Sequence, residues 1–137
     1  MNLPYLSILT VLASLCTACY TGNKASYLQR TAAAANDHIM LVRSAPPTFG
    51  FQRLTALSEA YPDLGIFIRQ TGQPDFLAET KKDDNRYLIL YYTKTRKAFA
   101  CRTGAGRSRQ VEFSGPYPIT DGELRTLQGL RTRSEAP

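Results

Sequence analysis

The positively charged side chains of this sequence gather in one stretch that could bind an anion. Six lysines and arginines fall within residues 94–109, and no Asp or Glu interrupts them. They are Lys94, Arg96, Lys97, Arg102, Arg107 and Arg109. A β-hairpin would concentrate them into one lobe suited to an anionic partner, which could be lipid headgroups, lipopolysaccharide, peptidoglycan, an acidic protein or nucleic acid. The same residues could instead protect a solvated sheet edge from pairing with another strand.

Two other kinds of residue could support catalysis, but neither has the spacing that catalysis requires. Cys101 lies in an apolar stretch, where a free cysteine behaves as a small hydrophobic residue. A nucleophilic Cys101 would need a nearby base or cation, and Arg102 would point to the opposite face of a strand. Four acidic residues fall within residues 75–84, namely Asp75, Glu79, Asp83 and Asp84. They show neither the glycine nor the ligand spacing of a calcium loop.

The sequence therefore predicts no catalytic residue, no metal ligand and no cofactor. His38 is the single histidine, which excludes chemistry built on several imidazoles. Three cysteines are too few for a zinc site made of cysteines alone. A small secreted hydrolase that uses Cys101 or the carboxylates is kept as an alternative.

The N-terminus has the pattern of an export signal. The first 23 residues contain no Lys, Arg, Asp or Glu, and residues 3–15 are mostly apolar. This run is shorter than the roughly 20 apolar residues that span a bilayer. Small residues follow it, as in a secretory signal peptide. The alternative is a buried first helix of a cytosolic domain.

The end of this run resembles the signal of bacterial lipoproteins, in which small residues precede a cysteine that is acylated. Residues 15–19 read Leu-Cys-Thr-Ala-Cys, so that Thr17 and Ala18 precede Cys19. Cys16, the other candidate, follows the bulkier Leu15. The resemblance implies that residues 1–18 are a signal peptide and that a lipid on Cys19 anchors the chain to a membrane.

The residue after Cys19 bears on which membrane holds the chain. In Gram-negative lipoproteins an Asp at this position commonly retains the protein at the inner membrane, and here the residue is Tyr20. The resemblance therefore implies the outer membrane, facing the periplasm, if the host is Gram-negative. Simple cleavage after Ala18 would instead release a secreted protein, in which a Cys19–Cys101 disulfide could form.

The rest of the chain divides into a tether, a domain and a tail. Residues 19–47 are expected to form a partly helical tether, because residues 31–35 favour helix and residues 40–42 could continue an apolar pattern. Pro46 and Pro47 end this pattern. We expect a compact domain over residues 48–133 and a disordered tail over 134–137.

The spacing of apolar residues and the positions of proline and glycine predict an α+β domain. Apolar spacing predicts a helix over 51–61, and Pro62 and Gly72 are placed to open and close a second helix. Four strand candidates follow at 76–80, 86–93, 98–102 and 111–114, and two prolines then end the sheet. A capping-box pattern at residues 120–123 starts the last helix. The fold is two N-terminal helices, a three- to four-stranded antiparallel meander and a C-terminal helix, with the helices on one face.

Residues 51–114, with Gly72 and Pro74 between the helices and the strands, resemble the small envelope lipoproteins of the SmpA/BamE type. In these proteins a Gly-x-Pro closes the helical part before the sheet. The resemblance implies a non-enzymatic accessory subunit that helps outer-membrane β-barrel assembly.

The predicted function is therefore that of a non-enzymatic bacterial envelope lipoprotein acting as a protein-interaction or scaffolding module. The first alternative is a binder of anionic lipid headgroups or glycans through residues 94–109. Nucleic acid is excluded as a partner, because an export signal removes the chain from it. The identity of an envelope partner and the oligomeric state are left open.

Overall fold

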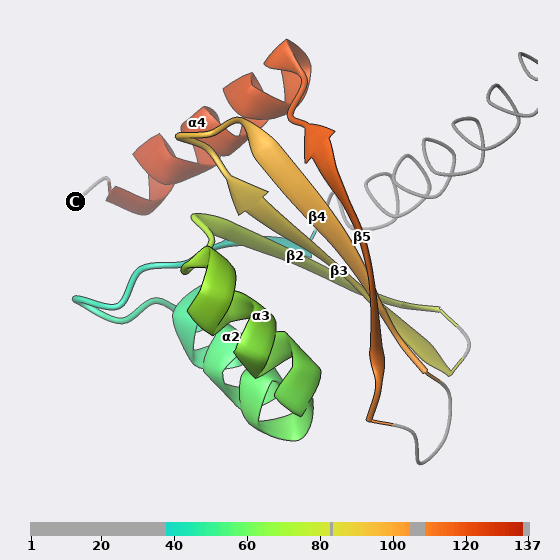
Figure 1. Ribbon diagram of the computed structural model, residues 1–137. Helices are drawn as coiled ribbons and strands as arrows, with labels where there is room; N and C mark the ends of the chain where they lie inside the picture. The colour runs from blue at the N-terminus through green and yellow to red at the C-terminus, as the bar shows by residue number, and fades with distance from the viewer. Residues whose placement is uncertain (1–37, 83, 105–108, 136–137) are drawn as a thin grey trace, which may run out of the picture. The chain divides into compact units, whose positions relative to one another are not determined.

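Five strands form one antiparallel sheet in a computed structural model that describes residues 38–82, 84–104 and 109–135 (Figure 1). All of these residues belong to one unit, Thr31–Pro137. The predicted signal peptide, Cys19 and the tether up to residue 37 lie outside the described residues.

The sheet is a simple meander in which neighbours in sequence are neighbours in space. The strands are β1 (Ile39–Leu41), β2 (Phe76–Lys82), β3 (Asn85–Tyr92), β4 (Lys97–Thr103) and β5 (Val111–Pro118). Every adjacent pair is antiparallel, with Leu77 opposite Leu90 and Leu88 opposite Cys101. The prediction of an α+β fold with an antiparallel meander is confirmed.

The three helices lie close to their predicted ranges, although the first runs from Phe49 to Ala60 and not over 51–61. They are α2 (Phe49–Ala60), α3 (Pro62–Thr71) and α4 (Asp121–Glu135). Pro62 occupies the first turn of α3, and Gly72 follows its end with a φ of 98°. At α4 the Thr120 hydroxyl accepts from the Glu123 amide at 3.2 Å, and the Glu123 carboxylate accepts from the Thr120 amide at 3.1 Å, which is a capping box.

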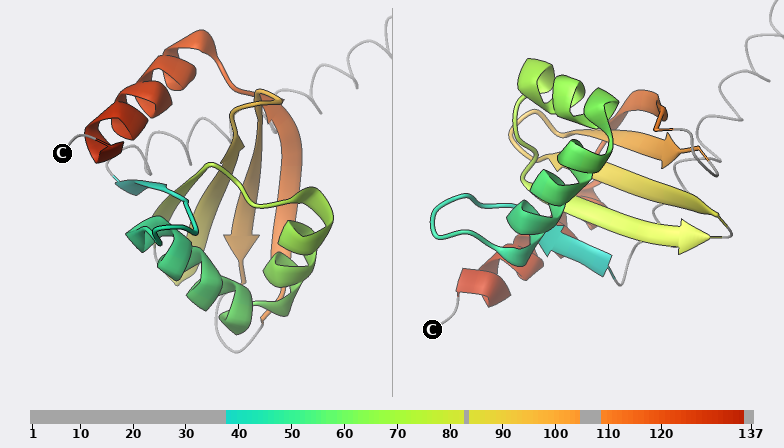
Figure 2. Two further views of the ribbon diagram at one scale, coloured as in Figure 1. Left: turned by 90° about the vertical axis from the view of Figure 1, so that its left-hand side faces the viewer. Right: turned by 90° about the horizontal axis from the view of Figure 1, so that it is seen from below.

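The helices cover both faces of the sheet, so the expectation of one covered face was wrong (Figure 2). Leu77, Leu88 and Leu90 pack with residues of α2 and α3 on one side. Ile89 and Tyr91 pack with Leu124 and Leu127 of α4 on the other. Successive strand residues point to opposite faces, and β3 is apolar at both sets of positions, so each face needs a cover.

The structure places part of the predicted tether and tail within regular elements. Ile39–Leu41 forms the edge strand β1, and Val42 is buried against α2. Residues 40–42 therefore do not continue a helix as expected, because backbone pairing with β2 overrides the local pattern. At the other end α4 runs to Glu135, so residues 134 and 135 are helical.

The prolines of β5 do not end the sheet as expected. β5 continues through Pro116 to Pro118, which lies opposite Lys97. A shift in register occurs between Ala98 and Ala100 of the partner strand. Because β5 is an edge strand, one side of its backbone is free of ladder bonds, and proline is tolerated there.

None of the helices in the described ranges is both long enough and apolar enough to cross a membrane.

Candidate functional site

The structure divides the predicted basic residues between the two ends of β4. Lys94, Arg96 and Lys97 lie in or beside the β3–β4 turn. Arg102 lies about 17 Å further along the strand, at roughly 3.3 Å per residue, and forms an ion pair with Glu112. Arg109 lies beyond that end and is exposed, whereas Arg107 is outside the described residues. The expectation of a single lobe was wrong, because a strand of this length separates its ends.

Lys94 and Arg96 of the β3–β4 turn border an open cleft of ≈ 420 Å³. The cleft is lined by Phe76, Thr93, Lys94, Arg96, Leu124, Gln128 and Arg131. Its size lies in the range of small-molecule sites, which combine an apolar lining with a few convergent polar groups. Three cations from two elements thus surround a partly apolar cleft.

The β3–β4 turn is held in place by the carboxylate of Asp75. Oδ2 of Asp75 accepts from the Thr93 amide at 2.8 Å and from the Thr93 hydroxyl at 2.9 Å. The Arg96 carbonyl accepts from the Ile119 amide at 2.9 Å, which ties the turn to the start of α4. These bonds fix the backbone that carries Lys94 and Arg96.

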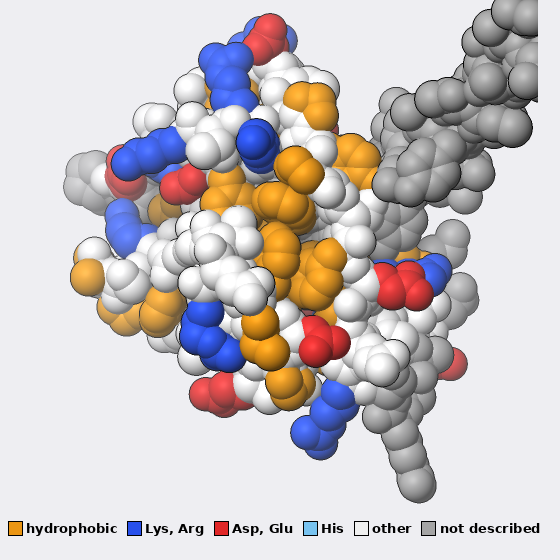
Figure 3. Space-filling model, viewed as in Figure 1, with side chains coloured by type: hydrophobic (Ala, Val, Ile, Leu, Met, Phe, Trp, Pro, Cys, Tyr) orange, Lys and Arg blue, Asp and Glu red, His pale blue; other side chains and the backbone are white. Residues whose placement is uncertain are grey.

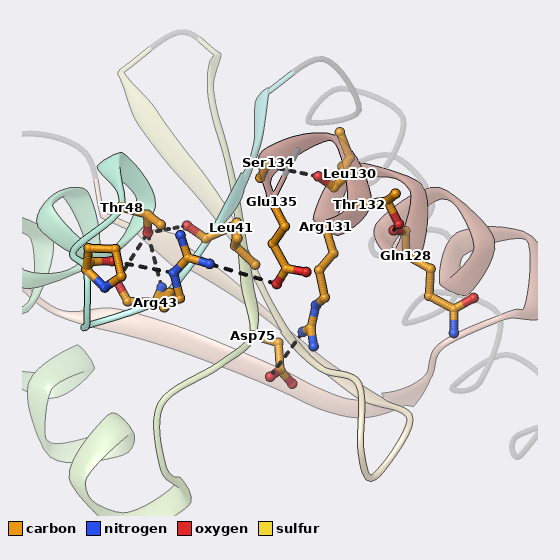
Figure 4. A network of polar contacts seen from close by, with 11 residues as sticks. Leu41, Arg43, Thr48, Asp75, Gln128, Leu130, Arg131, Thr132, Ser134 and Glu135 are labelled. Atoms are coloured by element: carbon orange, nitrogen blue, oxygen red, sulfur yellow. Dashed lines mark hydrogen bonds and ion pairs between the residues drawn. The ribbon is translucent and has the colours of Figure 1, made fainter. Parts of the chain in front are cut away.

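Helix α4 supplies the other wall of the cleft. Leu124, Gln128 and Arg131 follow one another at i, i+4 and i+7, and so share one side of the helix. The Arg131 guanidinium lies 3.5 Å from Oδ1 of Asp75 (Figure 4). It also lies 5.5 Å above the centre of the Phe76 ring. The sequence also shows Arg125, Arg131 and Arg133 on the predicted last helix. Arg131 and Gln128 were not among the predicted site residues, although their spacing from Leu124 could have placed them beside the core.

The charges around the cleft are only partly compensated. Asp75 faces Arg131, and Asp121 lies 3.3 Å from Arg96 in an exposed ion pair. Lys94 has no carboxylate partner within the described part of the chain. The cleft therefore keeps an excess of positive charge and of hydrogen-bond donors, an arrangement that can hold a phosphate, sulfate or carboxylate group.

Aromatic side chains of the inner strands lie on both faces of the sheet. Tyr91 is buried on the α4 side. Tyr92 and Phe99 lie on the other side, where their ring centres are 5.9 Å apart. Phe67 of α3 stacks on Phe113 at 4.6 Å, and hydrophobic side chains gather across this face of the molecule (Figure 3). Most of this aromatic area is packing between α3 and the outer strands.

Cys101 is buried, as expected for a small hydrophobic residue. It packs with Leu88 and Leu90 beneath α2 and α3. Burial raises the pKa of the Cys101 thiol to about 12, so the reactive thiolate is scarce at neutral pH. The enclosed thiol does not favour nucleophilic chemistry.

The predicted acidic group does not converge on one point. Asp75 serves the cleft, whereas Glu79 accepts from Nε and Nη2 of Arg53 at 2.7 and 2.6 Å. Arg86 Nε lies 3.1 Å from the same carboxylate without the alignment of a hydrogen bond. Asp84 is exposed in the β2–β3 turn, and Asp83 is outside the described residues. Within those residues no cluster of three His, Cys, Asp or Glu side chains could hold a metal ion.

Comparison of the chain with protein-family models, with curated proteins and with solved structures gives no match. The resemblance to SmpA/BamE-type lipoproteins therefore rests on the sequence features described above.

Proposed function

We propose that this chain is a non-enzymatic protein of the bacterial envelope whose α+β domain binds an anionic group in the cleft between the β3–β4 turn and α4. The observation that carries the proposal is the convergence of Lys94, Arg96 and Arg131 around that one cleft. This set of proposed binding residues differs from the predicted set at 94–109. The predicted residues at the far end of β4 do not line the cleft, whereas Arg131 does.

The chemistry of the cleft suits a phosphate-like or carboxylate group. Guanidinium groups donate paired hydrogen bonds to planar or tetrahedral oxyanions, and Lys94 adds a mobile positive charge. Gln128 can donate to a remaining oxygen, whereas Thr93 already donates its N–H and its O–H to Asp75. Because the cleft is open to solvent, salt will weaken the binding of an anion.

The envelope location is supported by the sequence of the N-terminus. An apolar run without charges leads to Cys19 after two small residues, and acylation there would anchor the domain to the outer membrane of a Gram-negative host. Bacterial envelopes present anionic headgroups and glycans, which are ligands of the predicted chemical class. A scaffolding role in the envelope stays a prediction.

The test is calorimetric titration of pyrophosphate into the full chain and two variants. Lys94→Gln combined with Arg131→Gln should weaken binding about tenfold, since two of three convergent charges are lost. The matched control is Arg109→Gln combined with Arg125→Gln, which removes the same net charge away from the cleft lining. No measurable binding to the unaltered chain, or an equal loss in both double variants, would refute the cleft as the site.

A further inference from the structure

The most exposed large hydrophobic residue of the described chain lies at the same end of the domain as the cleft. Phe49, the first residue of α2, has 72% of its surface exposed. It follows a turn in which Ala45, Pro46 and Pro47 are also exposed. The turn projects from the domain beside the last turn of α4 (Figure 2). Phe49 and the exposed residues 45–47 therefore form an apolar tip at this end of the molecule.

The tip is held rigidly rather than left as a loose loop. The Thr48 hydroxyl donates to the Leu41 carbonyl at 2.6 Å and accepts from the amides of Arg43 and Phe51 at 3.1 and 3.3 Å. Gly50 lies so close to β1 that a Cβ there would be 2.3 Å from the Leu41 carbonyl oxygen. The backbone on both sides of Phe49 is fixed, so its exposure is a built feature of the fold.

Several cations lie at the same end of the domain as the tip. Arg43 lies 3.8 Å from Glu135 at the end of α4, and Arg131 lies one turn earlier on that helix (Figure 4). Lys94 and Arg133, near the same end, have no carboxylate partner among the residues that the structure describes. The tip thus combines an apolar point with flanking cations, which is the pattern of interfacial membrane binding.

We propose that this end of the domain docks on an anionic lipid surface, with Phe49 in the interface and lipid phosphates at the cleft of Lys94, Arg96 and Arg131. The assignment of phosphates to the cleft rests on the proposed function. One phenylalanine and two prolines are too small for the apolar core of a protein interface, which buries about 800 Å² on each partner. They suffice for insertion among headgroups, where flanking cations add their attraction.

The chain contains no tryptophan, so the fluorescence of one introduced tryptophan reports on the surroundings of that position alone. The experiment uses the full chain with Cys19→Ala, carrying either Phe49→Trp or the control Ile66→Trp. Ile66 lies on α3 and is 45% exposed. Vesicles of equal parts phosphatidylcholine and phosphatidylserine should shift the emission of the Phe49→Trp chain to the blue and leave that of the Ile66→Trp chain unchanged. Pure phosphatidylcholine vesicles should shift neither.

A second pair of variants measures the strength of docking. Phe49→Ser should weaken partitioning onto the anionic vesicles about tenfold, and Ile66→Ser should leave it unchanged. An unshifted Phe49→Trp chain, or equal effects at positions 49 and 66, would overturn the docking proposal. If pyrophosphate binding persists in that case, the proposed anion-binding cleft is retained and only membrane docking is refuted. If pyrophosphate binding is absent, the proposed function fails whatever the vesicles show.

Discussion

Arg131 of α4 and Asp75 before β2 lie 3.5 Å apart, and this pair sets the charge of the cleft. Asp75 also holds Thr93 through two hydrogen bonds. The carboxylate thus positions one wall of the cleft and competes with any anion for the cation on the other wall. Binding an anion means that Arg131 exchanges one carboxylate partner for a ligand.

The first prediction concerns Asp75→Asn. The amide oxygen can still accept from Thr93, while the negative charge facing Arg131 is gone, so pyrophosphate should bind about three- to tenfold more tightly. Calorimetric titration measures the effect. Asp84→Asn, in the exposed β2–β3 turn, is the control for net charge. Weaker binding in the Asp75→Asn chain would contradict the placement of the anion beside Arg131.

The second prediction concerns the carboxylate that joins α2 to β2. The hydrogen bond from Arg53 lowers the pKa of Glu79 against the opposing effect of burial. Glu79→Gln should therefore cost about 1–3 kcal/mol of unfolding free energy at neutral pH. A carboxyl with a lowered pKa stabilises the fold above its unfolded pKa, so the difference should shrink as pH falls through the lowered value, below 4.5.

The control for Glu79 is an exposed ion pair. Glu112→Gln removes the partner of Arg102 at a solvent-exposed position, where such pairs contribute little. Urea unfolding at neutral and acidic pH compares the two variants. An equal loss of stability in both, or a Glu79→Gln deficit that is constant with pH, would contradict the assignment.

The third prediction concerns the accessibility of Cys101. Because the thiol is buried and its pKa is raised to about 12, it should resist an aromatic disulfide reagent at mildly alkaline pH until the domain unfolds. The measurement uses the chain with Cys16→Ala and Cys19→Ala, in which Cys101 is the single thiol. Rapid labelling of the folded chain would show that the thiol is accessible and would reopen a catalytic role.

The fourth prediction separates two glycines by the space around them. Gly50→Ala places a Cβ 2.3 Å from the Leu41 carbonyl oxygen, so it should destabilise the domain by about 1–3 kcal/mol or more. Gly129→Ala, within α4, meets no heavy atom within 4 Å and should stabilise by about 0.5–1 kcal/mol. Thermal unfolding of both variants decides the matter. Equal melting temperatures would contradict the close packing of α2 on β1.

Much of the fold could be predicted because its signals are local. Pro62, Gly72 and the Thr120–Glu123 pair mark helix ends through backbone conformation and capping bonds, which depend only on nearby residues. The strand β1 has three residues, too few to show a period, and it forms because β2 offers a free edge. Its existence depends on a partner that lies far away in the sequence.

The positions of the helices and of the charges required three-dimensional reasoning. The two apolar sides of β3 already implied that both faces of the sheet are covered, which places α4 opposite α2 and α3. The length of β4 separates Lys97 from Arg102. The pairing of Arg131 with Asp75 could not be read from the sequence, because it depends on the direction in which α4 crosses the sheet.

The most direct test of the cleft is to map its amides by nuclear magnetic resonance while pyrophosphate is added to the isotope-labelled full chain. The account predicts that the amide resonances of residues 93–96 and 128–131 shift together and saturate with one affinity. The amide resonances of Arg109 and Val111 should not shift. Shifts confined to the far end of β4, or spread evenly over the surface cations, would contradict it.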